Sequence, residues 1–302
     1  MGTVSNLIEQ ARYDLVDYQE GLEYDDKVLF VYLNRLISVM DSTLTSLRSD
    51  YIHGIEEDID CVTDQNYVDL TNMNNGNWDS LRHVWIGQDR KYPNSIDTLY
   101  YKRKFRTGSA EPNFWAIEGK QLLWEQDCDS AHTDLTIHFN KNHRPRLESW
   151  SDTFTASTAD VLSLVTGAHT FVSGDGPFTV SNSGGSLPTG LSASTNYYLV
   201  FINSNTSTCK LATSKINALE GTVVDISATG SGTHTITLNG DMMPYEGAFD
   251  HAIREMMVMH ARAKGEGKIG QPEAIYNAVF KKRAMEETIR RGFQEKYYSI
   301  DW

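Results

Sequence analysis

The sequence predicts an α+β protein with a helical core built from N- and C-terminal helices, a β segment, and an inserted all-β module of a small sandwich or barrel type. Three patterns lead to this prediction. Apolar residues recur at helical spacing at both ends, strand-like runs fill residues 55–150, and Ser, Thr and Gly dominate residues 151–240. We therefore expect a core domain from residues 1–150 and 242–302, interrupted by a β module at residues 151–241.

Two helices are expected at the N-terminal end. Between Val4 and Tyr18 the apolar residues share one helical face. Asp25 and Asp26 suit the start of a second helix, because a carboxylate there accepts backbone N–H groups and interacts favourably with the helix dipole. This helix should run to about Arg48, and its narrow apolar stripe favours packing against other helices.

The segment that follows is typical of β structure. A turn cluster at Asn72–Asn77 separates runs of apolar and aromatic residues. Four of these runs are expected to be strands: Thr98–Tyr101, Phe114–Ile117, Gln121–Trp124 and Leu135–Phe139.

The Ser/Thr/Gly-rich part repeats short strand-like pieces separated by turn signals, which is typical of a small all-β module. The expected strands are Val161–Val165, Phe178–Val180, Tyr197–Ile202, Cys209–Ala212 and Thr235–Leu238.

Helical spacing returns after Pro244. One helix should end at Gly265–Gly267, and Pro272 suits the first turn of the next because proline lacks the N–H that is unpaired there. The apolar positions expected to carry the last helix are Ile275, Val279, Ile289 and Phe293.

Charge and cysteine content narrow the function classes. The chain has 27 Lys and Arg against 40 Asp and Glu, a net charge of -13, so it lacks an overall basic footprint for nucleic acid. The acidity either keeps the protein soluble or lines a passage through which DNA slides without binding. Three separated cysteines without a CxxC pair favour neither a zinc site nor a disulfide framework. With no signal-peptide pattern and no run of about 20 apolar residues, we expect cytoplasmic synthesis and no membrane partner.

No specific catalytic, metal or cofactor motif is recognisable. His132 and His138 lie near several aspartates, but their spacing matches no known ligand pattern, so structural roles are favoured. Acidic pairs such as Glu56–Glu57 would serve glycoside hydrolysis only if two carboxylates faced each other about 5–10 Å apart. We therefore expect no enzyme activity, no cofactor and no metal.

The C-terminal segment combines cations and aromatic residues, the side chains that interface hot spots use. It is a candidate surface for a neighbouring chain, although the cations could also form a solvated face and the aromatic residues could pack on their own domain. The candidate residues are Lys281, Lys282, Arg283, Arg290, Arg291, Phe293, Tyr297, Tyr298 and Trp302.

Several segments resemble the head-to-tail adaptor proteins of short-tailed phages, which join the portal to the tail. The resemblance covers about residues 1–150 and 242–302. It is carried by the N-terminal helices and by the segments Phe114–Gly119, Met243–Ile253 and Arg262–Glu266.

The inserted part is similar to a small β module of phage virion and tail proteins, whose role is surface decoration or partner docking. We expect Tyr197, Tyr198 and Phe201 as its candidate surface; alternating burial would instead make them core residues. The motifs that carry this likeness are Gly174–Phe178, Leu187–Leu191, Asn196–Tyr198, Lys210–Ser214 and Gly230–His234.

The resemblance implies a structural virion protein that forms a ring of twelve copies below the portal. It implies as partners the portal protein, the tail nozzle protein and other copies of the chain, with tail fibres as a further candidate and DNA only in passage through the channel. It also implies a location in the neck of the virion. Some adaptor proteins are linked to cell-wall hydrolysis, but no matching acid pair is found here. The alternatives are a tail-associated peptidoglycan hydrolase and a carbohydrate- or fibre-binding tail protein.

Overall fold

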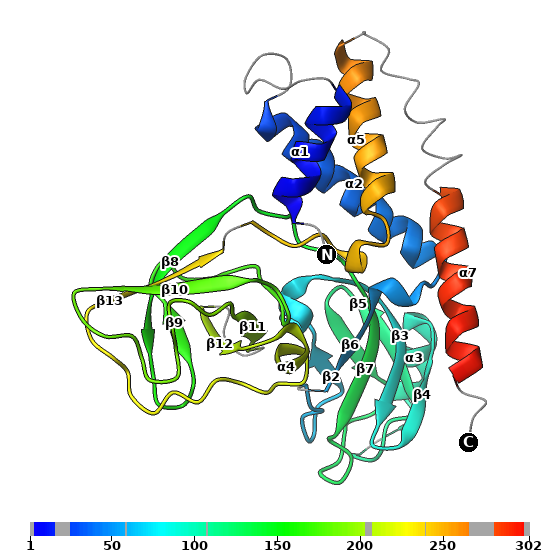
Figure 1. Cartoon of the computed structure of the whole chain (residues 1–302). Coiled ribbons are helices and arrows are strands. Elements are labelled where there is room, and N and C mark those ends of the chain that lie inside the picture. Colours follow the sequence, from blue (N-terminus) through cyan, green and yellow to red (C-terminus); the bar gives the residue numbers. More distant parts are fainter. Residues whose placement is uncertain are drawn as a thin grey trace. The chain divides into compact units, whose positions relative to one another are not determined.

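The computed structural model describes residues 3–15, 25–57, 59–106, 108–202, 207–238, 240–265 and 281–298. The chain divides into two units, one formed by Met1–Ile52 with His143–Trp302 and the other by His53–Asn142 (Figure 1). The first unit contains helices and a β module, and the second contains a separate sheet. The boundaries of the units differ from those of the predicted domains. The helices and the β module fall in one unit, and the β segment forms the other. The α+β class is as predicted.

Helices from both ends of the chain pack together in the first unit, as Figure 1 shows. They are α1 (Val4–Leu15), α2 (Asp26–Ser46), α5 (Asp250–Gly265) and α7 (Lys281–Tyr298), with short 3₁₀ turns η1 (Asp50–Ile52) and η3 (Tyr245–Gly247). Asp25 caps α2, where its side chain accepts a hydrogen bond from the Lys27 N–H at 3.1 Å. The apolar stripes of these helices form one buried cluster, so the predicted helical core is confirmed. Among the described helices, none has the length and apolar character of a membrane span.

The β module is a six-stranded antiparallel sheet in the order β10-β13-β8-β9-β12-β11. Phe178 and Tyr197 exchange two backbone hydrogen bonds of 2.8 Å, which join the two edges of the sheet and close it as a barrel. The inward residues form a hydrophobic cluster of the module's own. Its elements are β8 (Trp150–Ala156), β9 (Leu162–Leu164), β10 (Phe178–Ser183), β11 (Tyr198–Phe201), β12 (Thr208–Ala212), the helix α4 (Lys215–Leu219) and β13 (Thr233–Leu238).

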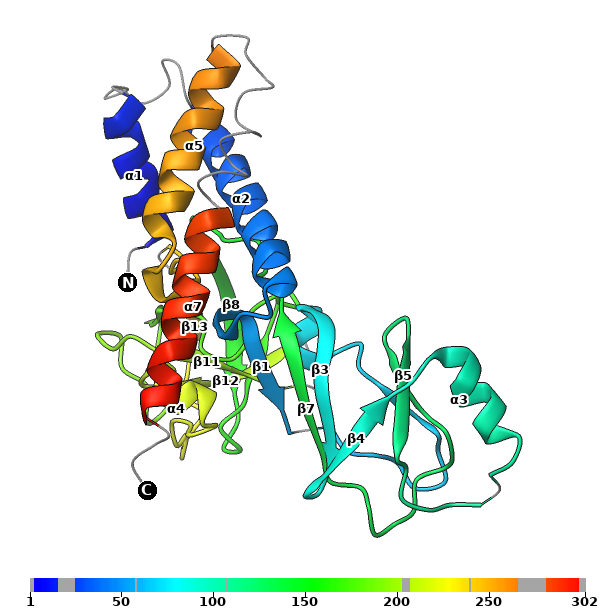
Figure 2. The same ribbon diagram turned by 90° about the vertical axis from the view of Figure 1, so that its right-hand side faces the viewer.

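The second unit is built on a seven-stranded sheet in the order β1-β7-β3-β4-β5-β6-β2, antiparallel except for β4 with β5 (Figure 2). Gly54 in β1 has no room for a side chain, because a Cβ there would lie 2.5 Å from Cζ of Phe139. The elements are β1 (His53–Glu56), β2 (Tyr67–Asp69), the 3₁₀ turn η2 (Met73–Gly76), β3 (Trp78–Ile86), β4 (Asp89–Pro93), α3 (Ile96–Arg103), β5 (Phe114–Glu118), β6 (Gln121–Trp124) and β7 (Leu135–Lys141).

One predicted strand is wrong, because Thr98–Tyr101 lies in the helix α3. Ser95 caps this helix, and its Oγ accepts a hydrogen bond from the Thr98 N–H at 3.2 Å. Leu99 is fully buried in a small cluster with Ala116 and Leu123 of the sheet. The cap and this single buried residue outweigh the strand preference of the adjacent tyrosines, since local propensity is a weak prior beside packing.

A buried ionic network holds the segments by which the chain enters and leaves the barrel. Arg144 lies before β8 and Asp241 follows β13, and each side chain is only 1% exposed. Two guanidinium nitrogens of Arg144 donate to the two Asp241 oxygens, at 2.7 Å each, and its Nε donates to Asp175 at 2.8 Å. The Arg144 guanidinium also lies 4.4 Å from the centroid of the Phe171 ring, and Asp241 accepts a further hydrogen bond from the Leu147 N–H at 2.8 Å.

Charge pairing in this network outweighs the effect of burial. Burial by itself would lower the pKa of Arg144, but Asp175 and Asp241 raise it above its ordinary value. Burial would likewise raise the pKa of Asp175, but Arg144 and Arg146 hold it below the ordinary value. Both groups are therefore ionised at neutral pH, and each depends on the other for its charge to be tolerated inside the protein.

A second network ties the same segments to α2. The buried Asp41 accepts hydrogen bonds from Nδ1 of His143 at 2.8 Å and from the Tyr245 hydroxyl at 2.7 Å. Asn34 accepts from the Arg146 N–H at 2.7 Å. Helix α2 therefore fixes the chain on both sides of the barrel.

We predict that Arg144→Met lowers the free energy of unfolding by about 3–5 kcal/mol, because it leaves Asp175 and Asp241 buried with only the more distant Arg146 as a cation. Chemical denaturation measures this loss. Lys282→Met is the matched control: it removes the exposed pair with Glu286, whose charged atoms are 3.9 Å apart, and should change stability by less than about 1 kcal/mol. Equal effects of the two substitutions would contradict this view of the network.

Candidate functional site

The described part of α7 has one buried face and one exposed face. Ala284 and Glu287 are buried, and α7 contacts α2 and η1. On the other face Met285 is 44% exposed and Ile289 is 56% exposed. Helix α7 therefore presents a row of apolar side chains to solvent next to the exposed Lys281.

The predicted cations behave differently from one another. Arg283 forms an ion pair with the buried Glu287, in which Nη2 lies 2.9 Å from Oε1. Lys281 and Lys282 are exposed. At this end of α7, Arg283 is therefore paired within the helix, whereas Lys281 and Lys282 are exposed beside the apolar row.

The remaining predicted interface residues fall at the end of the chain. Arg290, Arg291, Phe293, Tyr297 and Tyr298 lie on the α7 backbone, but their side chains are outside the described part of the structure. Trp302 also lies outside the described residues. Phe293 follows Ile289 by four residues, so its backbone position continues the row Met285–Ile289. Ile289, one of the apolar positions expected to carry the last helix, lies on the exposed face, because Ala284 and Glu287 occupy the buried side.

The predicted surface of the inserted module is corrected by the structure. Tyr197 is 1% exposed and Phe201 is 9% exposed, and both belong to the barrel core. The Tyr197 hydroxyl accepts a hydrogen bond from the Ser192 N–H at 2.8 Å. Only Tyr198 keeps partial exposure, because side chains alternate along β11. These three residues do not form an exposed aromatic platform.

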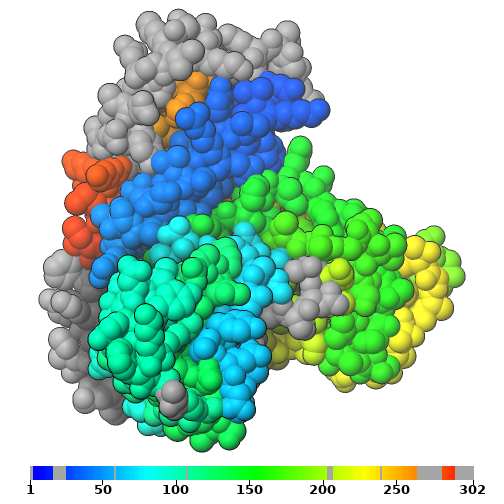
Figure 3. Space-filling view, turned by 180° about the vertical axis from the view of Figure 1, so that it is seen from behind, coloured from blue at the N-terminus to red at the C-terminus, as the bar shows by residue number. Residues whose placement is uncertain are grey.

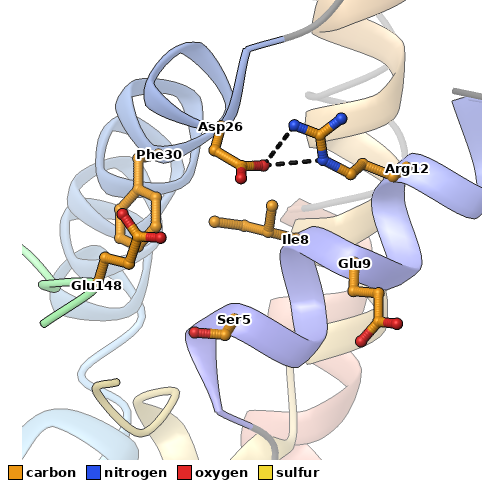
Figure 4. A pocket seen from close by; sticks show the side chains of 7 residues that line it. All are labelled: Ser5, Ile8, Glu9, Arg12, Asp26, Phe30 and Glu148. Carbon is orange, nitrogen blue, oxygen red and sulfur yellow. Dashed lines mark hydrogen bonds and ion pairs between the residues drawn. The ribbon is translucent and has the colours of Figure 1, made fainter. Parts of the chain in front are cut away.

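A pocket of about 330 Å³ opens between α1 and α2 (Figure 4). At one end Arg12 reaches Asp26, with Nε donating to Oδ1 at 2.8 Å. The wall also contains two carboxylates, Glu9 and Glu148, and the apolar Ile8 and Phe30. Arg12, the one cation among the residues that line the pocket, is already paired with Asp26. The pocket therefore resembles a packing contact between two helices more than a ligand-binding site.

A chain of charged groups lies in the second unit. Nδ1 of His132 is 2.7 Å from Asp129, and its Nε2 is 3.5 Å from Glu111. Glu111 in turn pairs with the buried Lys91, which lowers the pKa of Glu111. The order resembles an acid–base relay, but neither the pocket above nor a second one beside α5 includes these residues. Hydrogen bonds from Lys91 and His132 lower the pKa values of Glu111 and Asp129, which keeps both carboxylates ionised and suits a structural network.

Three histidines that the sequence analysis did not connect come together on the sheet. Nε2 of His53 lies 2.9 Å from Nδ1 of His138, and the rings of His138 and His83 are 6.1 Å apart. Burial lowers the pKa of His138, with a smaller opposing effect from Glu57 and a supporting one from Arg82. Strand register brings the three together, because His83 of β3 pairs with His138 of β7, and His53 of β1 is opposite Asn140, two residues along β7 from His138. No spacing in the sequence signals this arrangement.

Cys61 and Cys128 also meet, although they are far apart in the sequence. Both are free thiols buried in the core of the second unit. A hydrogen bond with Cys61, aided by burial, raises the pKa of the Cys128 thiol. Cys128 therefore stays neutral and packs as a small apolar residue. Among the described residues, no group of three His, Cys, Asp or Glu side chains is placed to hold a metal ion.

Comparisons with known proteins add no family assignment. No protein-family model matches the chain, and no curated protein matches it.

The histidine group predicts a dependence of stability on pH. The pKa of His138 is lower in the folded protein than in the unfolded chain, so the unfolded chain binds more protons as pH falls through about 6.5. Stability should therefore decrease between about pH 7.5 and 5.5, and His138→Gln should make this decrease smaller. His251→Gln is the control, because His251 is 71% exposed. Unfolding curves at several pH values provide the test, and an unchanged pH dependence in His138→Gln would contradict it.

Proposed function

We propose that the chain is a structural virion protein, a head-to-tail adaptor that forms a ring below the portal and links it to the tail. The observation that carries this proposal is the apolar row Met285–Ile289, displayed on the outside of a helical group that both chain ends build. The resemblance of residues 1–150 and 242–302 to adaptor proteins supports the same function. The charge of -13 suits a wall along which DNA moves without binding.

The exposed apolar side chains of the helical group suit assembly into a ring. Isolated exposed apolar residues are common, but two side chains one turn apart beside exposed lysines form a patch that a partner helix can cover. In a ring each copy uses one surface to contact the next copy or the portal, and head-to-tail contacts close when their rotation closes. The role needs no catalytic group, cofactor or metal.

In this proposal the barrel is a module for surface decoration or partner docking. Its buried Tyr197 and Phe201 do not support carbohydrate binding through those rings. The acid–base chain around His132 is the best argument for a hydrolase. The hydrogen bonds from Lys91 and His132, which lower the pKa values of Glu111 and Asp129, argue against it.

We predict that Met285→Ser combined with Ile289→Ser weakens binding to the portal of the same phage by at least about tenfold, because the exposed row would lose its apolar contacts. Sedimentation of mixtures with the portal measures the affinity.

The matched control is Val31→Ser combined with Ile216→Ser. These residues are 64% and 66% exposed on α2 and α4, so the same kind of apolar surface is removed elsewhere. Equal binding by the α7 variant and the unchanged protein would contradict the role of α7.

A further inference from the structure

Two cysteines meet in the core of the second unit. Cys61 is 3% exposed and Cys128 is fully buried, and both belong to the hydrophobic cluster of the second unit. Their side chains share a hydrogen bond, and both are free thiols. The third cysteine, Cys209, lies in the barrel core of the other unit. We call Cys61 and Cys128 the thiol pair.

Two long connections of the second sheet carry the thiol pair. Strands β1 and β2 are the two edges of the sheet, so the connection between them, which includes residues 59–66, leads from one edge to the other. The connection from β6 to β7, residues 125–134, also crosses the sheet, because these strands lie next to opposite edges. In Figure 3 light-blue and green parts of the second unit, from its start and its end, lie against each other.

Backbone hydrogen bonds hold the two connections together at the cysteines. The Cys61 N–H donates to the oxygen of Thr133 at 2.9 Å. The Asp64 N–H donates to the Cys128 oxygen, and the Cys128 N–H donates to the Gln65 oxygen, also at 2.9 Å each. Each cysteine thus has its own backbone fixed to the opposite connection. The approach of the two thiols therefore depends on the fold of both connections and not on one side-chain rotamer.

We propose that Cys61 and Cys128 form a redox site, in which a small-molecule disulfide such as oxidised glutathione converts the two thiols to an intramolecular disulfide. The thiolate of one cysteine attacks a sulfur of the small disulfide, forms a mixed disulfide and releases one small thiol. The thiolate of the other cysteine then attacks the protein sulfur of the mixed disulfide, which closes the protein disulfide and releases the second small thiol. Two electrons and two protons pass from the protein thiols to the small disulfide.

Burial makes this reaction slow. The hydrogen bond with Cys61, together with burial, raises the pKa of the Cys128 thiol, so little of the reactive thiolate is present at neutral pH. Both thiols are also covered, so the small disulfide reaches them when the two connections open locally. The reaction should therefore take minutes to hours, and it should become faster as pH rises.

The disulfide would join the two connections and close a long loop. The chain between the two cysteines includes β2, β3, β4, β5 and β6, which are five of the seven strands of the sheet. A cross-link around so long a loop restricts the unfolded chain, so oxidation should stabilise the second unit.

The first experiment counts thiols in the folded full-length chain. The protein is incubated with oxidised glutathione, then denatured and alkylated with iodoacetamide, and its mass and peptide map are determined. Without oxidation all three cysteines should be alkylated. After oxidation only Cys209 should be alkylated, and one peptide pair should join Cys61 to Cys128.

Variants provide the matched controls. Cys209→Ala should still form the disulfide, because Cys209 lies in the other unit. Cys61→Ala should form no intramolecular disulfide. Each variant is first compared with the unchanged protein in its unfolding midpoint without oxidant, which shows whether it is folded.

A second measurement follows stability. Four of the six tryptophans lie in the second unit, so tryptophan fluorescence reports its unfolding. Oxidation should raise the thermal midpoint of the unchanged protein and of Cys209→Ala by about 5 °C or more, and dithiothreitol should reverse the rise. The midpoint of Cys61→Ala should not respond to oxidant.

Two results would overturn the proposal. One is alkylation of all three cysteines after incubation with oxidised glutathione. The other is a lasting mixed disulfide between glutathione and Cys61 or Cys128, which would show that the second thiol does not reach the first. The inference concerns the second unit and not α7, so neither result affects portal binding, and the two proposals fail separately.

Discussion

The buried pair of Arg144 and Asp241 is the constraint on which the first unit depends. The two residues are distant in sequence, and they meet where the chain enters the barrel after β7 and leaves it before α5. An ion pair at this depth is tolerated only when nearly every donor and acceptor has a partner, and Asp175, the Leu147 N–H and the Phe171 ring supply them. Because Asp175 belongs to the barrel, the pair also attaches the barrel to the two chain segments that lead into it and out of it.

This arrangement explains how helices from opposite ends of the chain form one group. The chain leaves the barrel beside the point where it entered the barrel, so α5 packs directly on α1 and α2. Asp41 of α2 then binds His143 on the outgoing segment and Tyr245 on the returning one. With these contacts made, α7 packs on α2 and η1 and keeps Met285 and Ile289 outside.

Local patterns in the sequence predicted much of the fold. Spacing and the Asp25 cap predicted α2, and alternation predicted β7 and most barrel strands, because these signals depend on neighbouring residues. The helix α3 was missed because its cap and one buried leucine outweigh its tyrosines. The pairing of Arg144 with Asp241 and the stacking of His53 on His138 depend on contacts between distant segments, which spacing does not reveal. The candidate site could be predicted only in part. Lys281 and Lys282 are exposed, but Tyr197 and Phe201, expected at the surface of the module, lie in the barrel core because side chains alternate along the strand.

The central claim is that this chain assembles on a portal. Cryo-electron microscopy of the protein mixed with the portal of the same phage tests it most directly. The account predicts a closed ring of copies below the portal, with the α7 helix, Lys281–Tyr298, in contact with the portal or with the next copy. A mixture in which the chain remains unbound while the portal is intact would contradict it.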